Sequence, residues 1–156
     1  MSEIMLEIVC AALSTLGFAL LFHVRPCHLP VATLGGALSW VAYLLAEKAG
    51  AGLFLCSLLA ALAVCLWSET MARVRKAPAN VFLIPGIIPL LPGSKLYYTM
   101  SAMVSRDSET LFLQGTGTAL VAVGIAGGIV VASEIVRIFL RVQDWRRQKK
   151  QSGAAL

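Results

Sequence analysis

Hydrophobic residues occur along the chain in long blocks with few polar interruptions, not at the three- and four-residue spacing of amphipathic helices in soluble proteins. A block of about 18 or more apolar residues without charges is typical of a membrane-spanning helix. Charged residues and Pro/Gly turns delimit five such segments, at about residues 4–22, 29–46, 53–69, 80–105 and 110–136. We therefore predict an all-α integral membrane protein, with a bundle of about five transmembrane helices in residues 1–140 and a basic cytoplasmic tail in residues 141–156.

The composition excludes a soluble domain and a nucleic-acid-binding domain. Charged residues make up only 13% of the chain and hydrophobic residues 58%, so too few polar side chains are available to cover a surface in water. The net charge is +5, but the cations stand in short connectors and in the tail, without the folded basic face that nucleic acid requires. The four cysteines are scattered through apolar segments with no CxxC pair, so we expect no disulfide framework.

The basic residues predict the orientation of the chain, because cytoplasmic loops carry an excess of Lys and Arg. Five crossings place Arg25, the Arg73–Lys76 cluster and the tail on one side, and leave Lys48 and Arg106 in the connectors of the other side. The N-terminus is therefore expected outside and the C-terminus in the cytoplasm. A re-entrant fourth segment would separate the Arg73–Lys76 cluster from the tail, so we predict that this segment crosses fully.

The fourth segment cannot form a regular helix, because it contains three prolines and two glycines: Pro85, Gly86, Pro89, Pro92 and Gly93. A proline lacks the N–H that bonds to the carbonyl four residues earlier, which frees the carbonyls of Val81, Pro85 and Ile88. In roughly helical geometry these carbonyls fall on one face. The sequence therefore predicts a stripe of unsatisfied acceptors, which is tolerated at membrane depth only against protein or a watery cavity.

The chain can restart as a half-helix after the break. Gly93 permits a sharp bend, and Ser94 can cap a new helix that runs towards Ser105 with its positive end beside Lys95. Transporters use discontinuous helices of this kind to hold anionic groups at the helix N-termini, and cations or ammonium groups at the freed carbonyls. We therefore predict a carboxylate site at the N–H groups after Gly93. The alternative is a kinked helix whose carbonyls accept hydrogen bonds from neighbouring hydroxyls.

Lys95 and Tyr97 complete the candidate substrate site. An ionisable residue within a span is a functional candidate, although Lys95 can also snorkel to the outer surface and Tyr97 can belong to an interfacial aromatic belt. The substrate-binding residues predicted from the sequence are Val81, Pro85, Gly86, Ile88, Pro89, Pro92, Gly93, Ser94, Lys95 and Tyr97.

Proton coupling requires a carboxylate in the membrane, and the sequence offers two candidates. Glu134 stands near the cytoplasmic end of the fifth segment, and Glu69 ends the third. Each can be a proton relay. The alternative is an interfacial ion pair, for example between Glu134 and Arg137, which contributes only about 0–1 kcal/mol when it is exposed.

Metal binding and catalysis find no support in the sequence. His23, Cys27 and His28 do not form a metal site, because Pro26 interrupts their spacing and no fourth ligand is near. No nucleophile–base pair, carboxylate dyad or phosphate loop is present in the sequence, so we expect neither an enzyme nor a cofactor.

Small residues predict close helix packing in the fifth segment. Gly124 and Gly128 form a small-xxx-small pair, a spacing that lets membrane helices approach until their backbones touch. The partner of this face is either another helix of this chain or another subunit, including a second copy of the chain.

The run from Pro85 to Gly93, with Tyr97 shortly after it, resembles the signature of the threonine/serine exporter family. Residues 17–22 and 34–37 resemble the start of the same domain. In that family a larger and a smaller hydrophobic domain cooperate, and this chain is similar to the small subunit of the split, two-component form, whose relatives are associated with succinate export. The resemblance implies a larger partner subunit and export across the inner membrane, driven by the proton gradient. Lys95 and the basic tail are not part of the family pattern.

The predicted function is export of a small carboxylate metabolite, either a succinate-like dicarboxylate or threonine/serine, by one subunit of a two-component secondary transporter. Two alternatives stay open. A scaffold for a partner permease predicts that changes at Gly93 or Ser94 harm assembly rather than substrate affinity. A small oligomeric channel predicts flux without any partner. The basic tail either lies on anionic membrane lipid or docks on a partner, or it serves only as the positive-inside stop signal.

Overall fold

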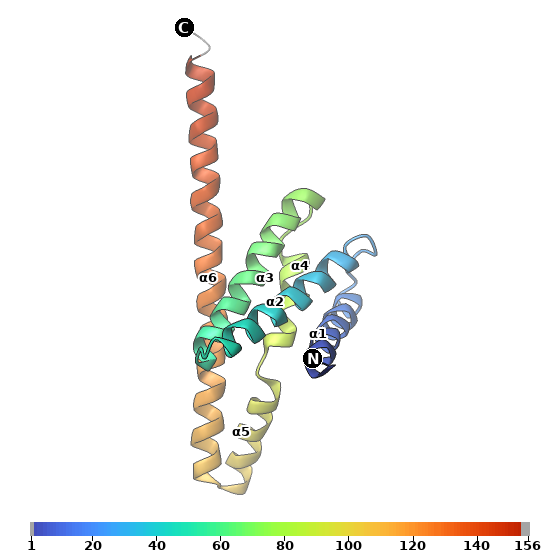
Figure 1. The fold of residues 1–156 in the computed structure, drawn as a ribbon, viewed down its shortest axis with the longest axis vertical. Coiled ribbons are helices and arrows are strands. Elements are labelled where there is room, and N and C mark those ends of the chain that lie inside the picture. The colour runs from blue at the N-terminus through green and yellow to red at the C-terminus, as the bar shows by residue number, and fades with distance from the viewer. Residues whose placement is uncertain (1, 154–156) are drawn as a thin grey trace.

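The structure, a computed structural model, describes residues 2–153 of the chain, and these residues form helices joined by short connectors (Figure 1). In chain order the elements are α1 (Ser2–Leu21), α2 (Leu29–Lys48), α3 (Leu53–Arg75), α4 (Asn80–Ile87), the 3₁₀-helix η1 (Ile88–Leu90), α5 (Gly93–Ser105) and α6 (Ser108–Gly153). Between residues 2 and 153 there is no strand.

Five spans can be counted in this arrangement. Three helices, α1, α2 and α3, and the first part of α6 are each long and apolar enough to cross a membrane. α4 and η1 together with α5 make a fifth span, which is bent by 55°. The prediction of an all-α membrane bundle of about five helices with a broken fourth is therefore confirmed.

Small side chains line the contacts between the helices. α1 and α4 pack on α2, α2 packs on α3, α3 packs most extensively on α6, and α5 packs on α6. The alanines at these contacts are almost completely buried, namely Ala19, Ala32, Ala60, Ala61 and Ala132. Lipid tails are as apolar as the side chains, so membrane helices gain stability from close packing rather than from leaving water.

Gly124 and Gly128 bring α6 against the backbone of α3. A Cβ at Gly124 would lie 2.6 Å from the carbonyl oxygen of Phe54, and a Cβ at Gly128 would lie 2.8 Å from the Cβ of Ala61. These separations are too short for any side chain, so the two glycines are required for the observed approach. The small-xxx-small face predicted from the sequence therefore packs within the chain.

α6 is much longer than the span predicted for it. Its 46 residues correspond to roughly 69 Å at a rise of about 1.5 Å per residue, more than twice a ~30 Å hydrocarbon layer. The chain contains no Pro or Gly between residues 129 and 152, so nothing interrupts the helix at the predicted start of the tail. The residues from 141 to Gly153 continue the same helix, and residues 154–156 lie outside the described part.

The turn between α5 and α6 is closed by local hydrogen bonds. Arg106 adopts a left-handed conformation, with a φ of 57°, and the N–H of Asp107 donates to the carbonyl of Ala102 at 3.0 Å. The hydroxyl and the backbone N–H of Thr110 donate to the carboxylate of Asp107 and lower its pKa. Asp107 therefore satisfies a free N–H at the start of α6 and lies at its positive end.

The fourth segment runs from one end of the bundle to the other. In Figure 1, α4 starts beside the end of α3, and α5 continues away from it towards the start of α6 without turning back. α6 then returns along α5 and α3. The segment therefore continues in one general direction, and its full crossing of a membrane stays a prediction.

Replacing Gly128 by alanine should destabilise the bundle, because the new methyl group would overlap the backbone and side chains of α3. Overpacking of this kind costs about 1–3 kcal/mol. Gly127→Ala is the matched control, since a Cβ there would meet only Cδ1 of Leu58 at the ordinary distance of 3.7 Å. In thermal unfolding of the purified chain in detergent, the midpoint should be lower for Gly128→Ala than for the unchanged chain, and it should not change for Gly127→Ala. Equal midpoints for the two variants would contradict the observed packing.

Candidate functional site

The fourth segment is divided into α4, η1 and α5, and each of these elements has a proline within it or next to it. Pro85 lies within α4, Pro89 lies in the 3₁₀-helix η1, and Pro92 stands immediately before α5 with φ −79° and ψ 55°. A 3₁₀-helix bonds each N–H to the carbonyl three residues earlier. It can therefore satisfy a carbonyl whose partner four residues later is a proline.

Two of the three carbonyls released by the prolines are bonded in this way. The N–H of Ile88 donates to the carbonyl of Pro85, and the N–H of Leu91 donates to the carbonyl of Ile88 at 3.1 Å. The hydroxyl of Ser39 in α2 also reaches the segment and donates to the carbonyl of Gly86 at 3.2 Å. The predicted stripe of unsatisfied acceptors is therefore wrong at Pro85 and Ile88, because 3₁₀ geometry supplies their donors.

Gly86 is the point at which α4 touches both α2 and α3. A Cβ at Gly86 would lie 2.6 Å from Cγ2 of Val64 in α3 and 3.6 Å from the backbone nitrogen of Gly36 in α2. Gly36 in turn packs against the side chain of Thr15 in α1. Residues of α1, α2, α3 and α4 therefore meet around two glycines, Gly36 and Gly86. This contact fixes the position of the broken segment in the bundle.

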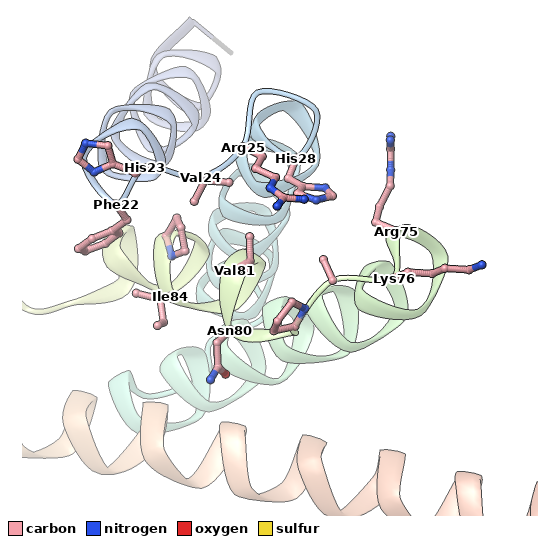
Figure 2. A pocket seen from close by; sticks show the side chains of 13 residues that line it. Phe22, His23, Val24, Arg25, His28, Arg75, Lys76, Asn80, Val81 and Ile84 are labelled. Atoms are coloured by element: carbon pink, nitrogen blue, oxygen red, sulfur yellow. The ribbon is translucent and has the colours of Figure 1, made fainter.

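A cavity of about 600 Å³ opens where the connector between α1 and α2 meets the connector between α3 and α4 (Figure 2). Val81, Ile84 and Pro85 of α4 form an apolar wall. The basic side chains that line the cavity are His23, Arg25, His28, Arg75 and Lys76, and no Asp or Glu is among the described residues of its lining. A cleft lined by charges of one sign raises the local concentration of ions of the opposite sign. The cavity is therefore suited to an anion.

Unusual local features gather in this cavity. His23 and Lys76 have φ values of 55° and 50°, in the left-handed region that residues with a Cβ rarely adopt. His28 packs edge-on against Phe82 with ring centroids 5.4 Å apart, and its Nδ1 is buried without a hydrogen-bond partner. Backbone strain and unpaired buried polar atoms are found preferentially at functional sites.

The ten substrate-binding residues predicted from the sequence do not form a single site. Val81 and Pro85 line the basic cavity, Gly86 is buried, Ile88 is half-buried in η1, and Pro89 lines a second cavity. Pro92 stands immediately before α5, and the remaining residues lie in α5, namely Gly93, Ser94, Lys95 and Tyr97.

The start of α5 is open at Gly93. No atom outside the local chain lies within 4 Å of a Cβ built at Gly93. Pro92, not Ser94, precedes the first helical residue, and it provides no side-chain cap because proline has no acceptor. Lys95 extends along α6, where its Nζ would be 3.8 Å from a Cβ at Gly117, and Tyr97 is exposed. One chain alone therefore does not enclose this helix terminus.

The two carboxylates predicted for proton coupling form ion pairs on the surface of their own helices. Glu134 lies 3.0 Å from Arg137, and Glu69 lies 3.2 Å from Arg73. Both pairs are one helical turn apart in sequence and partly or largely exposed. This arrangement matches the alternative of interfacial ion pairs.

The cations of the cavity are candidate site residues that the sequence interpretation did not assign to a site. It used Arg25, Arg75 and Lys76 only to orient the chain. Two basic connectors on the same side of a membrane bundle could have indicated a shared basic cavity. The distance between the two connectors, however, depends on how α1, α2, α3 and α4 pack.

An apolar helical bundle, interrupted by a broken span beside a charged cavity, has the architecture of a membrane transport protein. The sequence matches the family described as "Threonine/Serine exporter, ThrE" over residues 7–135. The chain therefore belongs to the threonine/serine exporter family, and the resemblance noted in the sequence is confirmed. It is an embedded multi-pass protein of a family of exporters. No solved structure matches the chain.

The contact of Gly86 with Val64 can be tested by a double-mutant cycle. Gly86→Ala should destabilise the chain by about 1–3 kcal/mol through overlap with Val64, and Val64→Ala should relieve part of that cost. We expect a coupling free energy of at least about 1 kcal/mol between the two changes. Gly93→Ala, at an open position, should leave the unfolding midpoint in detergent unchanged. Strict additivity of the two substitutions would contradict the contact.

Proposed function

We propose that this chain is one subunit of a two-component secondary transporter that exports a small carboxylate-bearing metabolite across the inner membrane. The observation that carries the proposal is the basic cavity beside the broken fourth span. Family membership supports export, and the charge of the cavity supports a negatively charged cargo.

The lining of the cavity favours a dicarboxylate over an amino acid. Arg25, Arg75 and Lys76 belong to the lining, where the side chains of Arg75 and Lys76 extend outward at the rim (Figure 2). More than one cation is thus available to a cargo with two carboxylates as it enters, and an arginine can bind a carboxylate through two parallel hydrogen bonds. The ammonium group of threonine or serine would meet no carboxylate among the described residues of the lining. A succinate-like dicarboxylate is therefore the proposed substrate, and threonine and serine are the competitors to be tested.

The position of the cavity suits the entry of an exported substrate. The two connectors whose residues line the cavity lie at the end of the bundle towards which the C-terminal part of α6 projects (Figure 1). The start of α1 lies towards the other end. The positive-inside rule assigns the basic end to the cytoplasm. The N-terminus is then outside, and the cavity is the inner entrance.

The one-sided packing of α5 supports a partner subunit. α5 packs on α6 and on no other helix to a comparable extent, and its start is open at Gly93. Large apolar side chains cover its remaining faces, for example Tyr97 and Val104, which are 67% and 86% exposed. A half-helix that contributes to a substrate path must be surrounded by protein. The larger subunit of the same family is the proposed neighbour, and a second copy of this chain is the alternative arrangement.

Removing the cavity cations should weaken substrate binding from the cytoplasmic side. The triple variant Arg25→Gln, Arg75→Gln, Lys76→Gln, reconstituted with the partner, should raise the KM for succinate at least about tenfold, equivalent to about 1.4 kcal/mol. Arg73→Gln is the matched control, because Arg73 pairs with Glu69 and does not line the cavity. The measurement is uptake of labelled succinate, threonine and serine into inverted vesicles. An unchanged KM for all three substrates would contradict the assignment of the cavity.

The two-component arrangement predicts that flux requires both proteins. Labelled succinate should move only when this chain and its partner are reconstituted together, and Gly93→Leu should reduce the flux to background while the complex still assembles. Gly93 is surrounded by open space within the chain, so the added side chain should not unfold it. Flux from this chain alone would indicate a channel, and flux that does not depend on this chain would indicate a scaffold.

A further inference from the structure

The C-terminal part of α6 extends beyond the rest of the bundle. Residues 110–133 carry no charge, and at a rise of about 1.5 Å per residue they are long enough to cross a ~30 Å hydrocarbon layer. The ion pair of Glu134 and Arg137, at 3.0 Å, follows this uncharged stretch. The helix then continues to Gly153, and its last part stands apart from the other helices (Figure 1). Residues 134–153, the α6 extension, therefore lie beyond the hydrocarbon layer.

The side chains that the structure describes in the α6 extension, up to Val142, are largely uncovered. Ala132, just before the extension, is fully buried, whereas every residue from 137 to 142 is exposed. Ile138 and Phe139 are each 61% exposed, and Val142 is 45% exposed. A contiguous group of exposed apolar side chains marks a surface that binds another molecule.

The exposed apolar residues form a stripe with the spacing of a coiled-coil seam. Val131, Ile135, Ile138 and Val142 follow one another at intervals of four, three and four positions, which is the alternation of the a and d positions in a heptad repeat. At about 100° per residue they lie on one side of the helix, and Leu140 lies on the opposite side. All four are between 43% and 61% exposed. A narrow stripe of this kind is suited to contact with a second helix.

The straight course of α6 argues against the membrane surface as the cover for this stripe. An amphipathic helix that binds lipid lies in the plane of the interface, so the extension would have to bend sharply after its span. Sharp bends occur at Pro, at Gly or where a group is inserted into the helical hydrogen bonds. The chain has neither Pro nor Gly between residues 129 and 152, and α6 is continuous there. The extension therefore projects away from the lipid.

The charge of the extension argues against a second copy of the chain and favours an acidic partner. Residues 137–150 contain six basic residues and one acidic residue, Asp144, so they carry a net charge of +5. Two copies anchored in the same membrane would place these segments parallel and side by side, with like charges adjacent. Like charges across an interface repel, whereas opposite charges attract a partner and select it. A helix whose flanks carry Glu or Asp complements the extension.

We propose that the α6 extension is the docking helix for an acidic amphipathic helix in the cytoplasmic part of the partner subunit. The apolar residues of that helix cover Ile135, Ile138 and Val142, and its carboxylates pair with flanking cations such as Arg141. The identity of the partner rests on the proposed two-component function. Because the extension continues the helix that packs on α3 and α5, a helix docked on it also holds the partner beside the broken span.

The first test uses a synthetic probe and does not require the partner. The purified full chain in nanodiscs should bind a peptide of about four heptads that carries Ile and Leu at the seam and Glu at the flanking positions, and added salt should weaken the binding. The double variant Ile135→Asn, Ile138→Asn should bind the peptide at least about tenfold more weakly. Its unfolding midpoint should not change, because both side chains are exposed. Leu140→Asn, on the opposite side of the helix, is the matched control and should bind as the unchanged chain does.

Other results of this test would overturn the proposal. Equal binding of a peptide with Lys in place of Glu would show that charge does not select the partner. An equal loss in Leu140→Asn and in the double variant would show that the stripe is not the contact. A dimer of the unchanged chain that the double variant dissociates, measured by light scattering, would assign the stripe to a second copy. Peptide binding that occurs in neutral nanodiscs but not in anionic ones would assign it to lipid.

The second test measures assembly with the partner subunit. In the double variant the dissociation constant of the complex should rise at least about tenfold, whereas Leu140→Asn should leave it unchanged. An unchanged dissociation constant in the double variant would overturn the docking of the partner on this helix, and the proposed transport function would stand. If the unchanged chain forms no complex and moves no substrate, the proposed function fails, and the peptide titration still decides whether the extension binds an acidic helix.

Discussion

The close approach of the backbones of α4 and α2, at Gly86 and the pair Gly35–Gly36, is the constraint on which the rest of the structure depends. Because Gly86 has no side chain, α4 lies directly on α2 and α3, with Val64 against one side of the glycine. The same approach brings Ser39 within 3.2 Å of the Gly86 carbonyl. A segment with broken helical bonding is stable at membrane depth only when protein covers it. These contacts provide that cover.

The position of α4 and η1 also creates the two cavities. Pro85 lies in the wall of a cavity lined by basic residues, and Pro89, about one turn further along, lies in the wall of a cavity that contains the carboxylate of Glu7. The run of three prolines shapes both walls, because its 3₁₀ bonds replace the regular helical ladder between Pro85 and Leu91.

The spans and the broken fourth helix were predicted from the sequence and are confirmed, whereas the ten-residue substrate site stays a prediction. The structure distributes these residues over two cavities, the 3₁₀-helix η1 and the start of α5. Lys95 illustrates the reason. Its position in a span marked it as functional, yet its side chain lies along Gly117, a contact that depends on how α5 is rotated against α6.

The sequence by itself determined every feature with a local cause: apolar blocks set the number of spans, and prolines set where the helical bonds stop. Local 3₁₀ bonds replace the helical bonds at Pro85 and Ile88. Only the tertiary structure decided which distant groups meet: Ser39 and Gly86 are separated by 47 positions, and Trp40 and Glu7 by 33. Arg25 and Arg75 lie in different connectors of one cavity. These contacts depend on the rotation and separation of the helices, which the packing of distant residues fixes.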